Sequence, residues 1–225
     1  YALLALVCFW PFLVRGETYF DGNILGDFPA WYDGVHHTQN YDLVDSIAQV
    51  YPAESLFHDE LRKGHWPLWN PYNMLGQPLY QGHGMYFYYP LTIILHALLP
   101  THRVHDWMLV IHTILCGFGM TWFLRLQGRG LAASHLGGIA WAFSGPLATM
   151  SQFHQTQITF AWLPVFLGCI SQAATQPTES RTSRGWLARG CLVGGLGVCA
   201  GPLNIAWICL SLGMLWCLTG ETPGR

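Results

Sequence analysis

The chain has 225 residues, of which 52% are hydrophobic, 15% aromatic and only 10% charged. A soluble globular protein carries roughly 25% charged residues, so this chain has too few charges to cover a surface that faces water. The net charge is −2 and the sequence contains no cluster of Lys and Arg, which excludes a nucleic-acid partner held through its phosphates. The composition predicts an all-α membrane protein, a multi-pass bundle of transmembrane helices.

The first apolar run covers residues 1–14 and is shorter than the roughly 20 residues that a membrane-spanning helix needs. A signal-peptide core and a truncated helix both have this length. A signal peptide would continue into a small-residue cleavage site, whereas this run continues into Arg15, Gly16 and Glu17. We therefore interpret residues 1–14 as a truncated first transmembrane helix.

Residues 15–105 form a polar and aromatic segment, which we call the outer segment. It holds nine of the 12 acidic residues, with a tenth, Asp106, directly after it. Near its end, the apolar stretch 89–99 is bounded by Pro90 and Pro100 and is too short to span a bilayer. We expect a folded outer segment whose helices lie along the membrane surface.

Residues 106–225 predict a helix bundle. The spans are expected at 107–126, 131–150, 158–174, 186–200 and 203–218. Gly190 and Gly194 are four residues apart, as are Gly197 and Gly201, and this spacing lets helix backbones approach closely.

The positions of Arg in the short loops predict the orientation of the bundle. Arg125 and Arg129 flank one connection, and three arginines lie in or next to residues 175–189, whereas residues 151–157 contain no basic residue. Basic loops favour the cytoplasmic side. The outer segment and residues 151–157 are therefore predicted outside, and residues 125–130 and 175–186 inside.

The helix predicted over residues 41–64, interrupted or kinked at Pro52, is amphipathic. Asp42, Asp45 and Gln49 share one face, and apolar residues occupy the opposite face. The acidic face has two interpretations. Its carboxylates could cap the helix start and favour its dipole, or one of them could act as a general base.

A group of motifs follows in the outer segment. The pattern Asp45-x3-Gln49-x-Tyr51-Pro52 precedes Leu61-x-x-Gly64-x-x-Pro67-Leu-Trp-Asn-Pro-Tyr72, and Tyr88-Tyr-Pro90 comes later. With His112 and Ala161-Trp-Leu-Pro164, these motifs resemble the YfhO family of bacterial multi-pass membrane proteins. The resemblance covers nearly the whole chain, but Gly201-Pro-Leu-Asn204 stands where relatives tend to show Gly-His-Pro-Gln.

The resemblance implies a GT-C-like glycosyltransferase of the bacterial cytoplasmic membrane, with its active face outward. Such an enzyme moves a sugar from a polyprenyl-phosphate donor to a cell-envelope polymer acceptor. Its base is an Asp in the first outer loop, a place that Asp45 fits, with Asp42 as the second candidate. An inverting transfer needs such a carboxylate to take the proton of the acceptor hydroxyl.

The leaving lipid phosphate needs cations, and Arg62, Lys63 and Arg103 are the candidates in the outer segment; the alternative is that they anchor the chain at lipid headgroups. The aromatic residues that include Trp69 and Tyr72 could form an interfacial belt or a platform for stacking sugars. The candidate substrate-binding residues are Gln49, Arg62, Lys63, Trp69, Asn70, Tyr72, Arg103 and His154. The histidine spacings match no strong zinc pattern, so we predict no metal site or cofactor, with a divalent metal kept as an alternative.

Two other functions stay open. A transporter or flippase for a lipid-linked glycan would place ionisable residues inside its spans, and the predicted spans contain none in their interiors. A non-catalytic assembly factor for the cell envelope is the third interpretation.

Overall fold

A computed structural model describes residues 1–19, 26–28, 32, 34, 44–79, 84–150, 154–177, 179–201 and 203–219. These residues are mostly helical, as the sequence predicts. The exception is a hairpin of two short antiparallel strands, β1 (Trp69–Asn70) and β2 (Gln77–Pro78), in which Trp69 pairs with Pro78 and Asn70 with Gln77.

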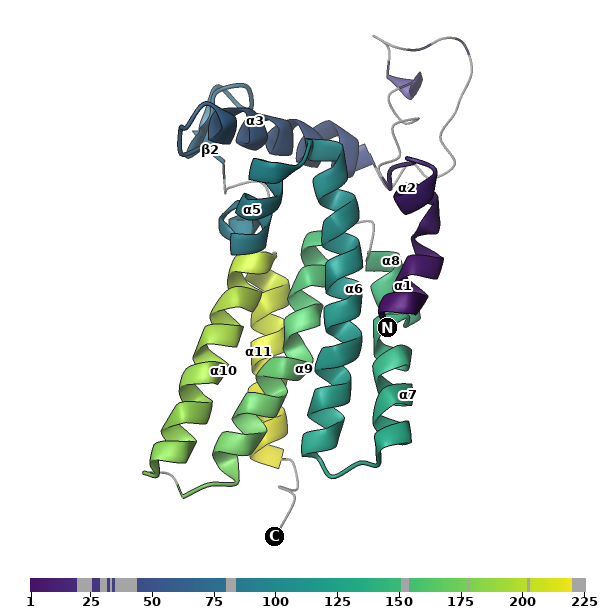
Figure 1. Cartoon of the computed structure of the whole chain (residues 1–225). Helices are drawn as coiled ribbons and strands as arrows, with labels where there is room; N and C mark the ends of the chain where they lie inside the picture. The colour runs from purple at the N-terminus through teal and green to yellow at the C-terminus, as the bar shows by residue number, and fades with distance from the viewer. Residues whose placement is uncertain are drawn as a thin grey trace.

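Long helices form a bundle whose axes run roughly parallel (Figure 1). It contains α6 (Thr101–Leu126), α7 (Leu131–Ala142), α9 (His154–Ala174), α10 (Arg181–Ala200) and α11 (Leu203–Thr219). Two helical stretches, Thr101–Leu126 and Gln155–Ala174, are long and apolar enough to cross a membrane. The structure therefore shows two candidate spans within a helical fold.

One predicted span is wrong as a continuous helix. Residues 131–150 divide into α7 and the short α8 (Gly145–Met150), with the break at Phe143 and Ser144. Pro146 explains the break, because a proline inside a helix lacks the N–H donor and its ring clashes with the carbonyl four residues earlier. With 12 residues, α7 is about 18 Å long and shorter than a bilayer core of about 30 Å.

The glycines of α10 face α9, which confirms the predicted close approach. A Cβ atom at Gly190 would lie 2.8 Å from Ile170 Cδ1, and one at Gly194 would lie 3.3 Å from Phe166 Cε2. At Gly201 a Cβ atom would collide with Thr159 and with the backbone of Gln155. Glycine is therefore required at Gly201, where a Cβ atom would meet backbone, whereas at Gly190 and Gly194 the Ile170 and Phe166 side chains would have to shift.

The outer segment begins after α1 (Ala2–Cys8) and α2 (Trp10–Val14). Its main helix, α3 (Tyr51–Arg62), follows a π-helical turn, η3 (Ser46–Val50), and lies across one end of the bundle (Figure 1). The predicted change of helix geometry lies at this point, since the π-helical turn ends at Val50 and α3 begins at Tyr51, which puts Pro52 in the first turn of α3. The predicted amphipathic pattern is confirmed where it is described, since Ile47 and Val50 are buried and Asp45 and Gln49 are exposed.

The outer segment and the bundle share one apolar core. The 3-10 turn η4 (Gly84–Tyr88) and α5 (Pro90–Leu98) lie between α3 and the long helices. Phe57 of α3, Phe87 of η4 and Met108 of α6 are fully buried in the same cluster. The position of α3 is therefore set by packing against the bundle.

The connections that follow α6 and α9 lie at the end of the bundle opposite α3 (Figure 1). The Arg-containing loops and the outer segment are thus at opposite ends, as the predicted topology requires. Residues 151–153 of the other predicted outer loop lie outside the described residues.

Candidate functional site

A pocket of about 350 Å³ lies between the start of α3 and the β1–β2 hairpin. We call it the outer pocket. Four of its side chains are carboxamides, Gln49, Asn70, Asn73 and Gln77, and Tyr72 adds a phenol. The remaining lining residues are Ala48, Pro52, Ala53, Met74 and Leu79. Three predicted substrate-binding residues, Gln49, Asn70 and Tyr72, are therefore brought together from two separate elements.

Asp45 lies beside this pocket and is held by one of its lining residues. The side-chain amide of Gln49 donates a hydrogen bond to Asp45 Oδ1 over 2.8 Å. Asp45 precedes η3 with helical backbone angles, φ −61° and ψ −35°, and its side chain makes no capping hydrogen bond. The helix start therefore does not use the Asp45 carboxylate as a cap. Asp42 lies outside the described residues.

The backbone of the β1–β2 hairpin is stabilised by a side-chain hydrogen bond at Asn70 and has positive φ angles at residues 74–76. Asn70 Oδ1 accepts a hydrogen bond from the Tyr72 backbone N–H at 2.9 Å, which stabilises the turn at Pro71. Met74 and Leu75 have positive φ angles of 49° and 64°, and Gly76 follows with φ 105°. A Cβ atom at Gly76 would lie 2.8 Å from the Trp69 indole. Trp69 therefore packs on the hairpin and is not among the residues that line the outer pocket.

Arg62 and Lys63 are at the other end of α3 from Asp45, roughly 25 Å away along a helix of this length. Lys63 Nζ forms an ion pair with Glu60 at 2.7 Å, and His65 Nδ1 lies 3.0 Å from the same carboxylate. Hydrogen bonds from Lys63 and His65 lower the pKa of Glu60, and the bond with Glu60 raises the pKa of Lys63. Arg62 and Lys63 are thus exposed at the end of α3 that is far from Asp45.

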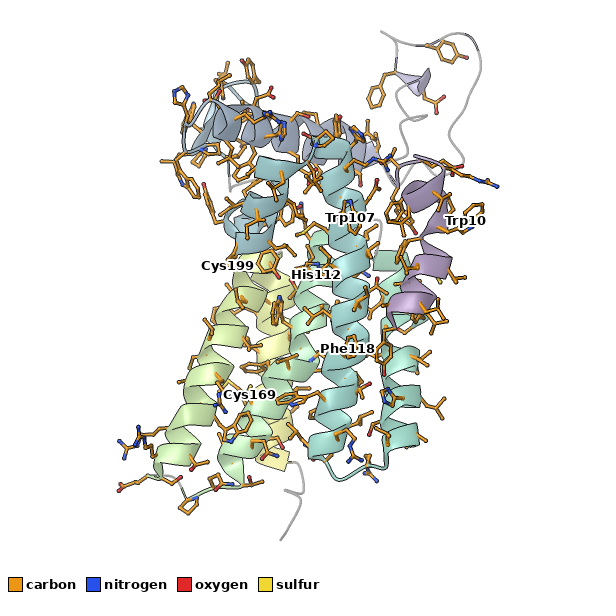
Figure 2. All side chains as sticks on the ribbon, viewed as in Figure 1. Trp10, Trp107, His112, Phe118, Cys169 and Cys199 are labelled. Atoms are coloured by element: carbon orange, nitrogen blue, oxygen red, sulfur yellow. The ribbon has the colours of Figure 1, made fainter. Side chains whose placement is uncertain are left out.

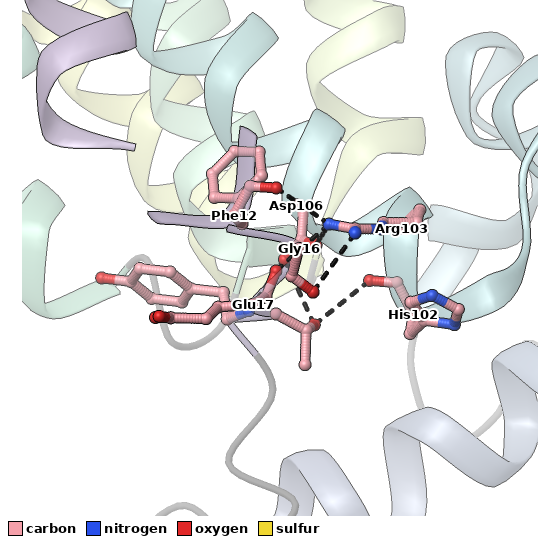
Figure 3. A network of polar contacts seen from close by, with 8 residues as sticks. Phe12, Gly16, Glu17, His102, Arg103 and Asp106 are labelled. Carbon is pink, nitrogen blue, oxygen red and sulfur yellow. Dashed lines mark hydrogen bonds and ion pairs between the residues drawn. The ribbon is translucent and has the colours of Figure 1, made fainter. Parts of the chain in front are cut away.

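Arg103 joins the chain after α2 to the start of α6 (Figure 3). Its guanidinium donates to the backbone carbonyls of Phe12 and Glu17 at 3.1 Å and of Gly16 at 3.2 Å. It also lies 3.5 Å from the carboxylate of Asp106.

Asp106 is fully buried and completes this arrangement, which we call the Arg103–Asp106 junction. Its Oδ1 accepts from the Tyr19 backbone N–H at 2.8 Å and from the Thr18 hydroxyl at 3.3 Å. The binding of a lipid phosphate by Arg103 stays a prediction. In this structure its guanidinium N–H groups donate to backbone carbonyls.

Three residues of the family-like motifs form a second buried connection, between the outer segment and the bundle. Trp162 Nε1 donates to Tyr89 Oη at 3.1 Å, and Tyr89 Oη lies 3.0 Å from His112 Nε2. His112 Nδ1 contacts the Met108 carbonyl at 2.8 Å. Because a carbonyl only accepts, Nδ1 donates there and Nε2 accepts from the tyrosine.

Burial raises the pKa of the Tyr89 phenol to about 12, an effect that the bond from Trp162 partly offsets. Tyr89 is therefore a hydrogen-bond donor at neutral pH. Figure 2 shows His112 within the helix bundle, and its side chain is fully buried. We call this chain of bonds the Tyr89–His112 junction.

A third polar group was missed by the sequence interpretation. Glu54 of α3 and His96 of α5 are fully buried, together with Tyr86 and Thr92. Burial, followed by the charge of Glu54, raises the pKa of Tyr86 well above its ordinary range. The signal in the sequence was an acidic residue between Val50 and Phe57 on the apolar face of α3.

Within the described part of the chain, no group of three or more His, Cys, Asp or Glu side chains could hold a metal ion. His154 begins α9, but its side chain lies outside the described residues. Comparisons with protein-family models, curated proteins and solved structures give no match to this chain. Its function is therefore inferred from the outer pocket, from Asp45 and from the helices beneath them.

Proposed function

We propose that the chain belongs to a multi-pass membrane glycosyltransferase of GT-C-like architecture that uses a polyprenyl-phosphate-linked sugar. The observation that carries this proposal is the carboxamide-lined outer pocket next to Asp45. The likeness of the motifs around Pro67–Tyr72 to the YfhO family supports the same class of protein. The acceptor would be a polymer of the bacterial cell envelope.

The lining of the outer pocket suits a neutral ligand that is rich in hydroxyl groups. A carboxamide both donates and accepts, as a hydroxyl does, so four of them can match several hydroxyls of one sugar. An aromatic ring such as that of Tyr72 offers an apolar face for stacking. None of the described lining residues is cationic, so we assign the outer pocket to the acceptor saccharide and not to the donor phosphate.

Asp45 is the base in this proposal. As the acceptor hydroxyl oxygen bonds to the anomeric carbon, its proton passes to the Asp45 carboxylate. The bond between the anomeric carbon and the phosphate oxygen breaks, and the lipid phosphate leaves with the electron pair. The bond from Gln49 fixes one carboxylate oxygen and leaves the other for the proton.

The test is transfer of labelled sugar from a polyprenyl-phosphate donor by membranes that contain the full-length protein. Asp45→Asn keeps the size of the side chain but cannot accept a proton, so we expect a loss of 10²- to 10⁴-fold in rate. Asp59→Asn is the matched control, because Asp59 is exposed on the same helix and does not line the pocket. If Asp45→Asn keeps more than about a tenth of the wild-type rate, the base is elsewhere.

The proposal places the outer pocket on the outer face of the bacterial cytoplasmic membrane, with the connections after α6 and α9 in the cytoplasm. Cysteine labelling with an impermeant reagent in intact cells tests this. A cysteine at position 72 is expected to react and one at position 180 to remain unlabelled. Labelling at position 180 with protection at position 72 would reverse the orientation.

One observation favours a transporter or flippase for a lipid-linked glycan. The predicted span began at residue 107, whereas α6 begins at Thr101 and includes buried Asp106, His105 and His112. Ionisable residues inside a membrane helix are a feature of transport pathways. Lipid-linked sugar that crosses vesicle membranes in the absence of an acceptor, at the same rate in Asp45→Asn, would establish this second function.

A further inference from the structure

A second cavity, of about 200 Å³, lies within the bundle. We call it the bundle pocket. Its walls come from the end of α1, from Tyr19, from α6, from the end of α7, from α8 and from α9. Among the described residues, none lines both this pocket and the outer pocket. Cys8 and Ala148 at its rim are exposed, whereas Ala142 and Leu147 deeper inside are buried.

The base of the bundle pocket is polar, although most of its wall is apolar. Gln157 of α9 and Thr113 of α6 both line it, and each is 2% exposed. Gln157 Nε2 donates to Thr113 Oγ1 over 2.9 Å. Within the described residues, Gln157 Oε1 has no hydrogen-bond partner. A buried carbonyl oxygen without a donor is costly, so a ligand that supplies a donor gains from binding there.

The apolar walls of the bundle pocket indicate the chemistry of the rest of the ligand. Thr113 and Gln157 lie in the two helices that are long and apolar enough to cross a membrane. The wall includes Phe9, Phe143 and Leu147, which suit a hydrocarbon. A volume of about 200 Å³ is below the 300–1,000 Å³ that is usual for drug-sized ligands, so a segment of a chain fits better than a whole lipid.

We propose that the bundle pocket binds a hydroxylated hydrocarbon chain, whose hydroxyl donates its hydrogen bond to Gln157 Oε1. The chain enters between Cys8 and Ala148, and its apolar part lies against Phe143 and Leu147. A hydroxylated acyl chain of a membrane lipid and a free long-chain alcohol share this chemistry. The site requires α6 and α9 to lie in a bilayer, but it is independent of sugar transfer.

The test uses the full-length protein in lipid nanodiscs and two photoreactive probes. Each probe carries a diazirine on a ten-carbon chain, and only one of them ends in a hydroxyl. In the wild type we expect the hydroxyl probe to label peptides from residues 1–19 and 141–150 about five- to tenfold more than the alkane probe, as one buried hydrogen bond allows. Equal labelling by the two probes would overturn the proposal.

Two variants make the test specific. Gln157→Leu removes the acceptor, so the excess labelling by the hydroxyl probe should disappear while labelling by the alkane probe persists. Ala148→Trp fills the rim at an exposed position and should reduce labelling by both probes. Persistence of the excess in Gln157→Leu overturns the role of the amide, and unchanged labelling in Ala148→Trp overturns the site even if Gln157→Leu does not fold.

Competition then identifies the source of the hydroxyl. A phospholipid with a 3-hydroxyacyl chain should displace the hydroxyl probe if the natural ligand is a lipid, and decanol alone should displace it if the ligand is a free alcohol. Displacement by either supports the site, whereas displacement by neither overturns it. Sugar transfer by Ala148→Trp should stay at the wild-type rate, which separates this outcome from a failure of the glycosyltransferase proposal.

Discussion

The outer pocket and the two buried junctions use polar side chains in opposite ways. In the outer pocket, Asp45 and Gln49 are exposed, and the bond between them is a local one across four residues. At the two junctions Asp106, Tyr89 and His112 are buried, Arg103 is partly exposed, and the bonds join segments 23 to 91 residues apart. Buried polar groups here attach one part of the molecule to another, whereas exposed groups beside a pocket are accessible to a ligand.

An Asp→Asn substitution should lower the stability of the protein at the Arg103–Asp106 junction but not beside the outer pocket. This is the largest difference that we predict. Asp106→Asn replaces an oxygen acceptor beside Arg103 by an amide donor, and we expect a loss of about 2–3 kcal/mol in the free energy of unfolding, as for a lost bond to a charged group. Asp45→Asn should leave the free energy of unfolding unchanged, since its carboxylate is exposed and caps no helix. Thermal unfolding in detergent measures both; equal melting temperatures for the two variants would remove the distinction.

Tyr89→Phe tests the second junction. The substitution keeps the ring but deprives His112 and Trp162 of their partner, so we expect a loss of about 1–3 kcal/mol in stability. Per molecule of folded protein, sugar transfer should be retained. Tyr88→Phe is the control, because the Tyr88 hydroxyl bonds to the Pro67 carbonyl over 3.5 Å and does not belong to the Tyr89–His112 junction. A large loss of transfer with normal stability would place Tyr89 in the active site instead.

Asn70→Ala should have the smallest effect of the substitutions. In contrast to Tyr89→Phe, it should reduce sugar transfer more than it reduces the amount of folded protein. Asn70 lines the outer pocket and stabilises the turn to Tyr72. We expect transfer to fall about tenfold, the value of roughly one good hydrogen bond to the ligand, while the amount of protein in the membrane falls less. Equal losses of activity and membrane level would assign Asn70 to folding.

Composition and helix periodicity predict the helical class and the amphipathic helix, and the glycine spacing predicts a close approach of helix backbones without naming α9 as the partner. Helix periodicity could not predict the break between α7 and α8, because residues 131–150 are apolar on both sides of Pro146 and hydropathy does not register a lost backbone bond. Nor could it predict that Thr101 starts α6. That start brings Asp106 and Arg103 onto one helix as a pair three residues apart.

The outer pocket was predictable only in part. The sequence predicts Asn70 and Tyr72 as substrate-binding residues and places Gln49 on the polar face of a helix, but their meeting depends on the way the hairpin folds back onto α3. Single-sequence patterns do not contain that tertiary contact. For the same reason Arg62, Lys63 and Arg103 were grouped with Asp45 as one site, although α3 separates the first two from it by its length and the third belongs to a junction.

The Arg103–Asp106 junction also has a consequence for the order of biosynthesis. The Phe12 carbonyl accepts a hydrogen bond from Arg103, which is synthesised 91 residues later. At about 5–20 residues per second, a ribosome needs roughly 5 to 20 s to reach that residue. During this interval α1 and α2 have none of their contacts with α6. Their attachment to α6 is therefore a late event, which is completed only when the start of α6 has been synthesised.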